Sequence, residues 1–305
     1  MRPKSLFRLL PLLLTALFTA SCGDRSVVAP SGLPSATLAV TPTPLAPGRV
    51  TIISIDGLRP DALFEAGAPN IIALAGRGAH TWRARTIMPS TTLPSHTSML
   101  TGYAPDVHGI SWDDYEPARG ALSVPTLFGI AQAHGLKTAM VVGKEKFATF
   151  RDTGGCDSWV LTLRGDDDVA SRAGALAGTS RPDLLFVHLP DVDLAGHASQ
   201  WMSPQYLDAV RAADRAVGRL LASLPADMTV ILTADHGGHL NNHGTTDAVD
   251  ITIPWIIAGP AIASGRDLSS SVATMDTAAT AALILGVQLS PDAGGRPVLE
   301  ALRQR

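Results

Sequence analysis

The sequence predicts an α/β fold with a doubly wound, mostly parallel central sheet and helices on both faces. From Arg49 to the C-terminus, short runs of apolar, often β-branched residues alternate with helical patterns. The apolar runs are nearly continuous, which is typical of parallel strands that are covered on both faces. With 305 residues and 46% hydrophobic content, the chain is long enough to bury such a core.

Five apolar runs are expected to form strands: 49–55 (RVTIISI), 137–142 (KTAMVV), 183–189 (DLLFVHL), 228–234 (MTVILTA) and 254–259 (PWIIAG). Three intervening segments are expected to form helices: 123–134, 203–225 and 274–286. The clearest of these begins at the N-cap residue Ser203, with Pro204 at the first helical position. No internal repeat or second linker interrupts the pattern, so we expect residues 49–305 to form one catalytic domain.

The first 48 residues read as a targeting signal followed by a tether. In residues 1–21, three cations precede the run LLPLLLTALFTA, which is too short for a spanning helix and fits a signal peptide. Small residues before Cys22 resemble a bacterial lipobox; a plain secretory signal is the alternative. Residues 22–48 are rich in Pro, Ser, Thr and Ala and are expected to be a tether. The expected location is periplasmic or extracellular, with membrane contact only through lipid on Cys22.

Three of the predicted strands are followed by carboxylates or imidazoles. Ligands of doubly wound sheets bind beyond the carboxyl ends of the strands, so these side chains are expected to meet. They are Asp56 after the first strand, Asp193 and His197 in PDVDLAGH, and Asp235, His236 and His243 in DHGGHLNNHG. Oxygen and imidazole donors together suit Zn²⁺, or Mn²⁺ and related ions, better than Mg²⁺ or Ca²⁺. Six protein ligands are enough for two ions that each keep an open position.

Four motifs, in order, resemble the alkaline phosphatase superfamily and, more closely, its type I phosphodiesterase/nucleotide pyrophosphatase branch. They are ISIDGLRPD, TTLPSHTSMLTG, DLAGH and TADHGG followed by HG, and they span about residues 51–260. The resemblance implies an alkaline phosphatase-like fold and a two-zinc phosphoester hydrolase. It assigns one zinc to Asp56, Thr92, Asp235 and His236, and the other to Asp193, His197 and His243. His239 is the alternative for the last ligand.

The resemblance also implies that Thr92, which precedes Leu-Pro-Ser-His, is a nucleophile that forms a covalent phospho-threonine. Thr91 is its rival, because a shift of one residue would exchange the two. A bound Zn²⁺ lowers the pKa of a coordinated water and would do the same for this hydroxyl. The segment PSHTSML predicts a helix with Pro94 in its first turn, whose free N–H groups would face a phosphate.

Two further segments bear on the substrate. In HGISWDDYEP, Asp113 stands where the family usually has an asparagine that donates to a phosphate oxygen. An ionised carboxylate cannot donate, which leaves open that Asp113 contacts a metal or that Asp114 takes over. In VVGKEKF, Lys144 and Lys146 are expected on one side of an extended segment, where they could hold a dianionic phosphate or a carboxylate. A solvated pair is the alternative. This Lys-x-Lys resembles that of phosphonoacetate hydrolases.

The sequence therefore predicts an extracytoplasmic, metal-dependent phosphoester hydrolase with a small phosphorylated or phosphonate substrate. The preference among monoesters, diesters and phosphonates stays open, and a phosphonate hydrolase is one alternative. An alternative of another class is a non-catalytic metal-binding relative, which the departure at Asp113 favours. A sulfatase is not expected, because no Cys/Ser-x-Pro-x-Arg motif lies near the predicted nucleophile. The formal charge of −3 indicates no nucleic-acid-binding surface.

Overall fold

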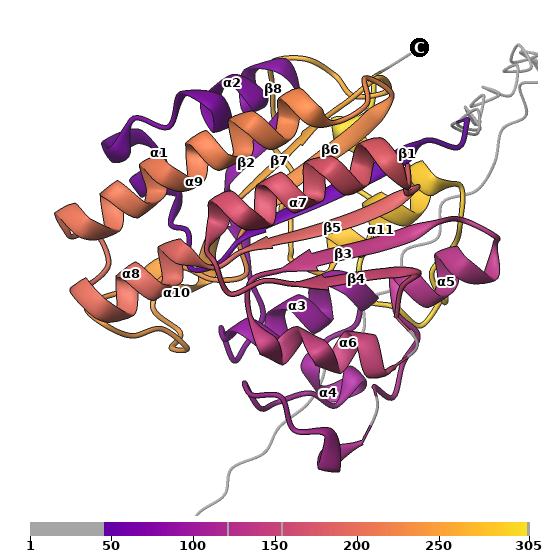
Figure 1. Cartoon of the computed structure of the whole chain (residues 1–305), viewed down its shortest axis with the longest axis horizontal. Helices are drawn as coiled ribbons and strands as arrows, with labels where there is room; N and C mark the ends of the chain where they lie inside the picture. Colours follow the sequence, from indigo (N-terminus) through magenta and orange to yellow (C-terminus); the bar gives the residue numbers. More distant parts are fainter. Residues whose placement is uncertain (1–45, 121, 154, 304–305) are drawn as a thin grey trace, which may run out of the picture. The chain divides into compact units, whose positions relative to one another are not determined.

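A mixed, mostly parallel sheet forms the centre of the molecule, in the order β4-β3-β5-β1-β6-β7-β2-β8 (Figure 1). Its strands are β1 (Arg49–Ile55), β2 (Ala79–Arg85), β3 (Thr138–Val142), β4 (Ser158–Leu161), β5 (Leu184–Leu189), β6 (Met228–Thr233), β7 (Thr252–Ala258) and β8 (Arg266–Asp267). This computed structural model describes residues 46–120, 122–153 and 155–303. The predicted signal peptide, and the tether up to residue 45, lie outside the described residues.

The five strands that the sequence predicts are all present, and the doubly wound, mostly parallel fold is confirmed. β1 is parallel to β5 and β6, and β3 is parallel to β4 and β5. Almost every residue of β1, β5 and β6 is buried, which explains their continuous apolar runs.

One expectation about strand direction is wrong. The strand predicted at 254–259 is β7, which runs antiparallel to both β6 and β2. Residues 234–251, which connect β6 to β7, contain only the four-residue helix α10 (Ala248–Ile251). For β7 to be parallel to β6, a crossover would have to bring the chain back to the end of the sheet where β6 begins. The connection between β6 and β7 contains no such crossover.

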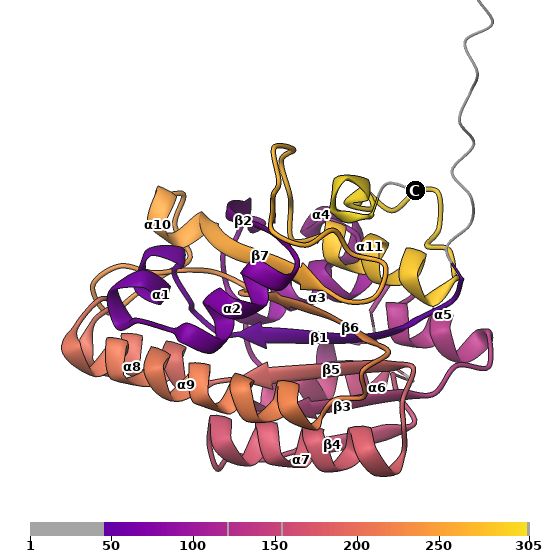
Figure 2. The ribbon, with the colours of Figure 1, turned by 90° about the horizontal axis from the view of Figure 1, so that it is seen from above.

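Helices cover both faces of the sheet (Figure 2). On one face lie α1 (Pro60–Ala66), α2 (Pro69–Arg77), α7 (Asp166–Thr179) and α9 (Pro204–Ser223). On the other lie α3 (Thr92–Thr101), α5 (Leu127–Ala133) and α11 (Asp276–Leu285). The predicted helices correspond to α5, α9 and α11, and α3 includes Pro94 in its first turn as expected.

Shorter helices connect these layers: α4 (Pro105–His108), α6 (Ala148–Asp152), α8 (Asp191–Ser199) and the 3₁₀ turns η1 (Pro117–Arg119), η2 (Glu145–Phe147) and η3 (Leu299–Ala301). The strands β3 and β5 point toward α8, so α8 lies at the carboxyl ends of these parallel strands (Figure 1). The predicted functional residues lie at these carboxyl ends. Among the described residues, no helix is long and apolar enough to span a membrane.

A buried carboxylate joins two of the helices on one face. Asp214 of α9 is 1% exposed and accepts hydrogen bonds from the first turn of α2, from the peptide N–H of Ile71 (2.9 Å) and from the side-chain amide of Asn70 (2.7 Å). The N-cap position of α2 is Ala68, which has no side-chain acceptor for these groups. Asp214 therefore caps α2 from a distant part of the chain.

We predict that Asp214→Ala lowers the free energy of unfolding by about 2–3 kcal/mol, because it leaves buried N–H groups without an acceptor. Denaturant titration measures this change. Asp208→Ala on the same helix is the control, since that exposed carboxylate contacts only the neighbouring turn through Arg211. Equal stability losses in the two variants would contradict the capping role of Asp214.

Candidate active site

Three buried carboxylates lie at the carboxyl ends of three parallel strands. Asp56 follows β1, Asp193 lies on the helix that follows β5, and Asp235 follows β6. Each is at most 2% exposed. Each also has one oxygen that is buried without a hydrogen-bond partner among the described residues: Oδ1 of Asp56, Oδ1 of Asp193 and Oδ2 of Asp235. Buried carboxylate oxygens normally have partners, so three orphaned oxygens in one place indicate a site for cations.

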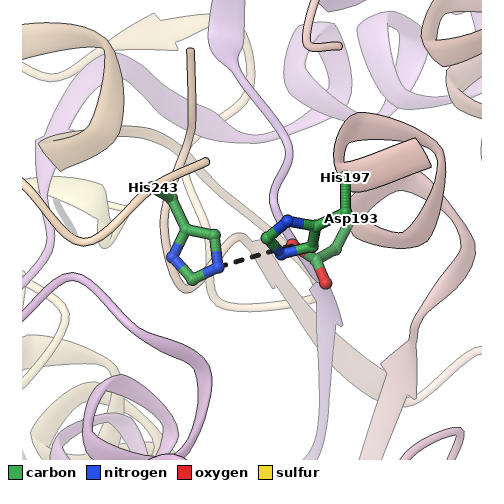
Figure 3. Close-up of side chains that lie close together, drawn as sticks. All are labelled: Asp193, His197 and His243. Carbon is green, nitrogen blue, oxygen red and sulfur yellow. Dashed lines mark ion pairs between the residues drawn. The ribbon is translucent and has the colours of Figure 1, made fainter. Parts of the chain in front are cut away.

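Asp193, His197 and His243 form the first group of possible metal ligands, as the sequence predicts (Figure 3). His197 Nε2 lies 3.4 Å from Asp193 Oδ1, and His243 Nε2 lies 3.8 Å from the same oxygen. Their ligand atoms all lie within 4.8 Å of one another. Asp193 and His197 come from one face of α8, and His243 reaches them from the loop before β7.

The second group differs in one member from the predicted set. The atoms within 4.8 Å of one another belong to Asp56, Asp193 and His236. Asp235 lies beside them, with Oδ2 3.3 Å from His236 Nε2. Its other oxygen is tied to two peptide N–H groups, those of Gly57 and His236. Asp193 is drawn toward Asp56 because both carboxylates face the same ammonium group.

That ammonium group belongs to Lys144, which the sequence places near the substrate rather than among the ligands. Its Nζ lies 2.7 Å from Asp56 Oδ2 and 2.6 Å from Asp193 Oδ2. Burial lowers the pKa of Lys144, but the two carboxylates outweigh burial and hold the pKa above its usual value. Lys144 is therefore a protonated counterion between the two ligand groups.

The three imidazoles are oriented alike. The Nδ1 atoms of His197, His236 and His243 lie 2.8–2.9 Å from backbone carbonyl oxygens, those of Asn241, Gly237 and Ser90 respectively. A carbonyl oxygen only accepts, so each Nδ1 carries a hydrogen and each Nε2 faces the carboxylates. This arrangement is typical of metal-ligating histidines, whose second nitrogen is fixed by an outer hydrogen bond.

The donor set and its surroundings therefore fit two divalent cations. Burial, and then the charge of His236, lower the pKa of His243 to about 4, so His243 is neutral, as a ligand must be. Burial lowers the pKa of His236, but Asp235 and Asp56 outweigh burial and raise it, so His236 must lose a proton before it binds a cation. Burial raises the pKa of Asp235, and the charge of Asp56 raises it further. Burial also opposes ionisation of Asp56, but Lys144 and His188 outweigh it and lower the pKa.

Two buried histidines behind the carboxylates were not singled out in the sequence. His188 is the polar residue in the apolar run of β5; its Nε2 donates to Asp56 Oδ2 (2.8 Å), while Nδ1 accepts from the Gly143 N–H. His96 of α3 donates from Nδ1 to the Thr92 carbonyl (2.7 Å) and accepts from the Ser54 hydroxyl (2.8 Å). A histidine inside an apolar strand is the signal that could have identified His188.

Trp201 is a third residue that sequence reasoning missed. Its indole Nε1 donates to the Gly57 carbonyl (2.9 Å), and its ring contacts those of His197 and His243. A Cβ added to Gly196 or Gly238 would lie within 2.6 Å of the ring. The indole thus packs between Gly196 and Gly238 and donates to Gly57. It therefore contacts all three segments that carry the candidate ligands.

The predicted nucleophile lies beside the cluster. Thr92 is the first residue of α3, is 1% exposed, and its Oγ1 lies 3.5 Å from His236 Nε2. Its rival Thr91 is the N-cap residue of α3, and its side chain caps nothing. The contact with His236 therefore places the hydroxyl of Thr92 at the cluster.

Asp113 and Lys146 form a pair at the start of α3. Asp113 Oδ1 accepts from the Leu93 peptide N–H (2.7 Å), and Oδ2 lies 2.6 Å from Lys146 Nζ. The two lysines lie around the 3₁₀ turn η2 rather than on an extended segment, so they reach different carboxylates. Neither contact places Asp113 among the ligand groups, and Asp114 is exposed.

His239, the alternative ligand, points elsewhere. Its Nδ1 lies 2.7 Å from Asp250 Oδ1. Asp250 also accepts from the N–H and hydroxyl of Thr245, so it fixes the loop that carries His243. His243 is therefore the histidine of this loop that the structure brings to the cluster.

A cavity of about 590 Å³ opens beside the cluster. Its lining combines two lysines and three acidic residues with apolar side chains: Lys144 and Lys146, Asp114, Glu145 and Asp191, and Tyr115, Leu163, Pro190 and Leu194. Leu163 and Leu194 are 71% and 54% exposed. The cavity provides room for the organic part of a substrate next to Lys144 and Lys146.

Comparison with known proteins places these residues in a family context. The family model described as type I phosphodiesterase / nucleotide pyrophosphatase matches residues 50–251. An uncharacterized pyrophosphatase/phosphodiesterase of Schizosaccharomyces pombe is 30% identical over 217 residues, which are 62% of this chain and 44% of that protein. Ectonucleotide pyrophosphatase/phosphodiesterase family member 3 of Mus musculus is 26% identical over 221 residues, 62% of this chain and 24% of that protein. The chain thus spans less than half the length of these relatives.

Solved structures share the fold at low sequence identity. An inactive threonine-to-alanine variant of murine ectonucleotide pyrophosphatase/phosphodiesterase 5, in complex with AMP, has a TM-score of 0.73 and 14% identity, covering 84% of this chain and all of that one. A 2-O GAG sulfatase has a TM-score of 0.70 and 16% identity, covering 85% of this chain and 74% of that one. The alkaline phosphatase-like fold expected from the motifs is confirmed.

We predict that Lys144→Met destabilises the metal-free protein by about 3 kcal/mol, because two buried carboxylates lose their counterion. Excess Zn²⁺ should remove most of this deficit, since cations bound to the same carboxylates replace the ammonium. Thermal and denaturant unfolding, with and without Zn²⁺, measure both effects. Lys137→Met, a lysine outside the cluster, is the control. A deficit that Zn²⁺ leaves unchanged would show that Lys144 does not share these carboxylates with metal.

We predict that Trp201→Leu weakens Zn²⁺ binding by about 10–100-fold, because the three segments lose the ring that joins them. Competition with a chromogenic chelator measures the affinity directly. Trp82→Leu is the matched control, since Trp82 lies on β2 and contacts Phe64 and His80. Unchanged affinity in the folded Trp201→Leu protein would contradict a positioning role.

Proposed function

Because the chain belongs to the type I phosphodiesterase/nucleotide pyrophosphatase family, we propose that it is a metal-dependent hydrolase of phosphoester bonds with Thr92 as nucleophile. The observation that carries the proposal is the orientation of the three imidazoles. Each presents Nε2 to buried carboxylates with orphaned oxygens, and the hydroxyl of Thr92 lies at the same place. Thr92 is buried, and its hydroxyl lies 3.5 Å from Nε2 of the ligand candidate His236.

Asp193, His197 and His243 would hold one cation, and Asp56, Asp235 and His236 would hold the other, beside Thr92. Mixed imidazole and carboxylate donors favour zinc, with Mn²⁺ or a similar ion as the alternative. When bound, such ions lower the pKa of a ligated hydroxyl and stabilise the negative charge of a phosphoryl group and its leaving oxygen.

The chain's own residues supply positioning and the nucleophile. α3 fixes the backbone of Thr92, and His96 holds its carbonyl through a hydrogen bond. Attack by Thr92 Oγ1 on phosphorus would break the bond to the leaving alcohol and give a phospho-threonine. Water would then attack the same phosphorus, release phosphate or a phosphomonoester, and restore the hydroxyl. An inactive threonine-to-alanine variant of the murine relative with AMP agrees with such a role for a threonine.

A non-catalytic metal-binding protein is the second candidate, and one observation favours it. The carboxylate of Asp113 occupies the Leu93 N–H, the peptide donor next to the nucleophile. A phosphoryl oxygen would need that donor or a replacement for it. Bound zinc without hydrolysis of any phosphoester would support this candidate over the hydrolase.

We further propose that the protein acts outside the cytoplasm, tethered to a membrane through lipid on Cys22. The sequence pattern of residues 1–21 supports this location. Mass spectrometry of the N-terminal fragment tests it, because lipidation adds the mass of acyl chains to a mature chain that starts at Cys22.

We predict that Thr92→Ala lowers kcat for bis-p-nitrophenyl phosphate by about a thousandfold or more, because it removes the nucleophile and leaves the carboxylate and imidazole ligands in place. Zinc content, measured in parallel, should stay within the range of the unsubstituted protein. Thr91→Ala, one residue earlier, should retain most activity. Loss of activity in Thr91→Ala with retention in Thr92→Ala would exchange the two assignments, and full activity in both would contradict a threonine nucleophile.

A further inference from the structure

The anion contacts at the start of α3 are already occupied by the protein's own carboxylate. Asp113 Oδ1 sits on the Leu93 peptide N–H at 2.7 Å, a distance typical of a charge-assisted hydrogen bond. Asp113 Oδ2 lies 2.6 Å from the ammonium of Lys146. One carboxylate therefore uses both the peptide donor beside Thr92 and the ammonium of Lys146.

Lys146 does not offer a free positive charge to an anion, because the carboxylate of Asp113 neutralises it. The Asp113 side chain is 35% exposed and that of Lys146, which lines the cavity, is 16% exposed, so water screens the charges of this pair only partly. A group that enters beside Leu93 meets a negative charge directly.

From these contacts we infer that Asp113 is a specificity-determining residue, which makes the site select monoanionic phosphodiesters over dianionic phosphomonoesters and phosphonates. A dianion brings one more negative charge toward the carboxylate, and it must compete with that carboxylate for Lys146 and for the Leu93 N–H. A diester carries a single charge, and its second ester group can lie in the neighbouring cavity against the exposed side chains of Leu163 and Leu194. This inference rests on the proposed phosphoester hydrolysis.

Charge-changing substitutions test it through the ratio of kcat/KM for p-nitrophenyl phosphate to that for bis-p-nitrophenyl phosphate. Asp113→Asn keeps an acceptor for the Leu93 N–H and removes the charge, so the ratio should rise about tenfold in favour of the monoester. Lys146→Gln leaves the carboxylate without its counterion, so the ratio should fall. Asp106→Asn, an exposed carboxylate on α4, is the control for loss of one negative charge.

Opposite shifts of the ratio in Asp113→Asn and Lys146→Gln, with no shift in Asp106→Asn, support the inference. An unchanged ratio in Asp113→Asn, or a shift in the same direction in both variants, overturns it. Turnover of neither substrate by the unsubstituted protein would count against the proposed hydrolase instead.

A binding measurement keeps the inference testable in that case. Calorimetry with zinc-loaded Thr92→Ala protein compares inorganic phosphate, which is largely dianionic at pH 8, with the monoanion bis-p-nitrophenyl phosphate. Adding Asp113→Asn to this protein should tighten phosphate binding about tenfold and leave the diester nearly unchanged. Equal changes for both ligands, or no change for phosphate, would overturn the role of Asp113 in discriminating charge.

Discussion

The rest of this site depends on one constraint, which is that three buried carboxylates lie close together and need positive charge to balance them. Each of Asp56, Asp193 and Asp235 follows a strand of the same sheet, so the fold itself forces them together. Burying carboxylates without countercharge is expensive, and neighbouring like charges add to that expense. Lys144 between Asp56 and Asp193, and the peptide N–H groups on Asp235, satisfy one oxygen of each. The remaining oxygens are the ones left for cations.

The protonation of the cluster follows from the same constraint. Lys144 and His188 lower the pKa of Asp56 despite its burial, whereas burial and Asp56 raise the pKa of Asp235. Without metal, the cluster therefore holds protons as well as the ammonium of Lys144. Metal binding would release those protons, so the affinity for zinc is expected to rise with pH.

Packing keeps the ligand-bearing segments close to one another. Gly196 and Gly238 leave room for the ring of Trp201, so the segments that carry Asp193 and His236 approach closely.

Much of this arrangement is readable from the sequence, because its signals are local. Continuous apolar runs identify β1, β5 and β6, and the polar residues after them locate the site at one edge of the sheet. β2 is not among the predicted strands, because its buried and more exposed residues alternate and it has no continuous apolar run. Such alternation is typical of a strand near the edge of a sheet. The direction of β7 depends on how the preceding loop returns, which apolar content does not encode. The alternating pattern of an antiparallel strand is also missing from β7, since both of its faces are covered.

The partners of Lys144, Lys146 and Trp201 could not be predicted from the sequence, because these contacts join distant segments of the chain. Lys144 and Lys146 lie two residues apart, yet one faces the ligand carboxylates and the other faces Asp113, because a 3₁₀ turn separates their directions. Trp201 has no motif of its own, and its role appears only when Gly57, Gly196 and Gly238 pack around it. Such pairings depend on the tertiary fold rather than on spacing along the chain.

The most direct test of the central claim is a crystal structure of the zinc-loaded protein with anomalous scattering measured at the zinc edge. The account predicts two anomalous peaks, one among Asp193, His197 and His243 and one among Asp56, Asp235 and His236. It also predicts that Lys144 no longer bridges Asp56 and Asp193. A single peak or none, with the ammonium of Lys144 still between the two carboxylates, would contradict it.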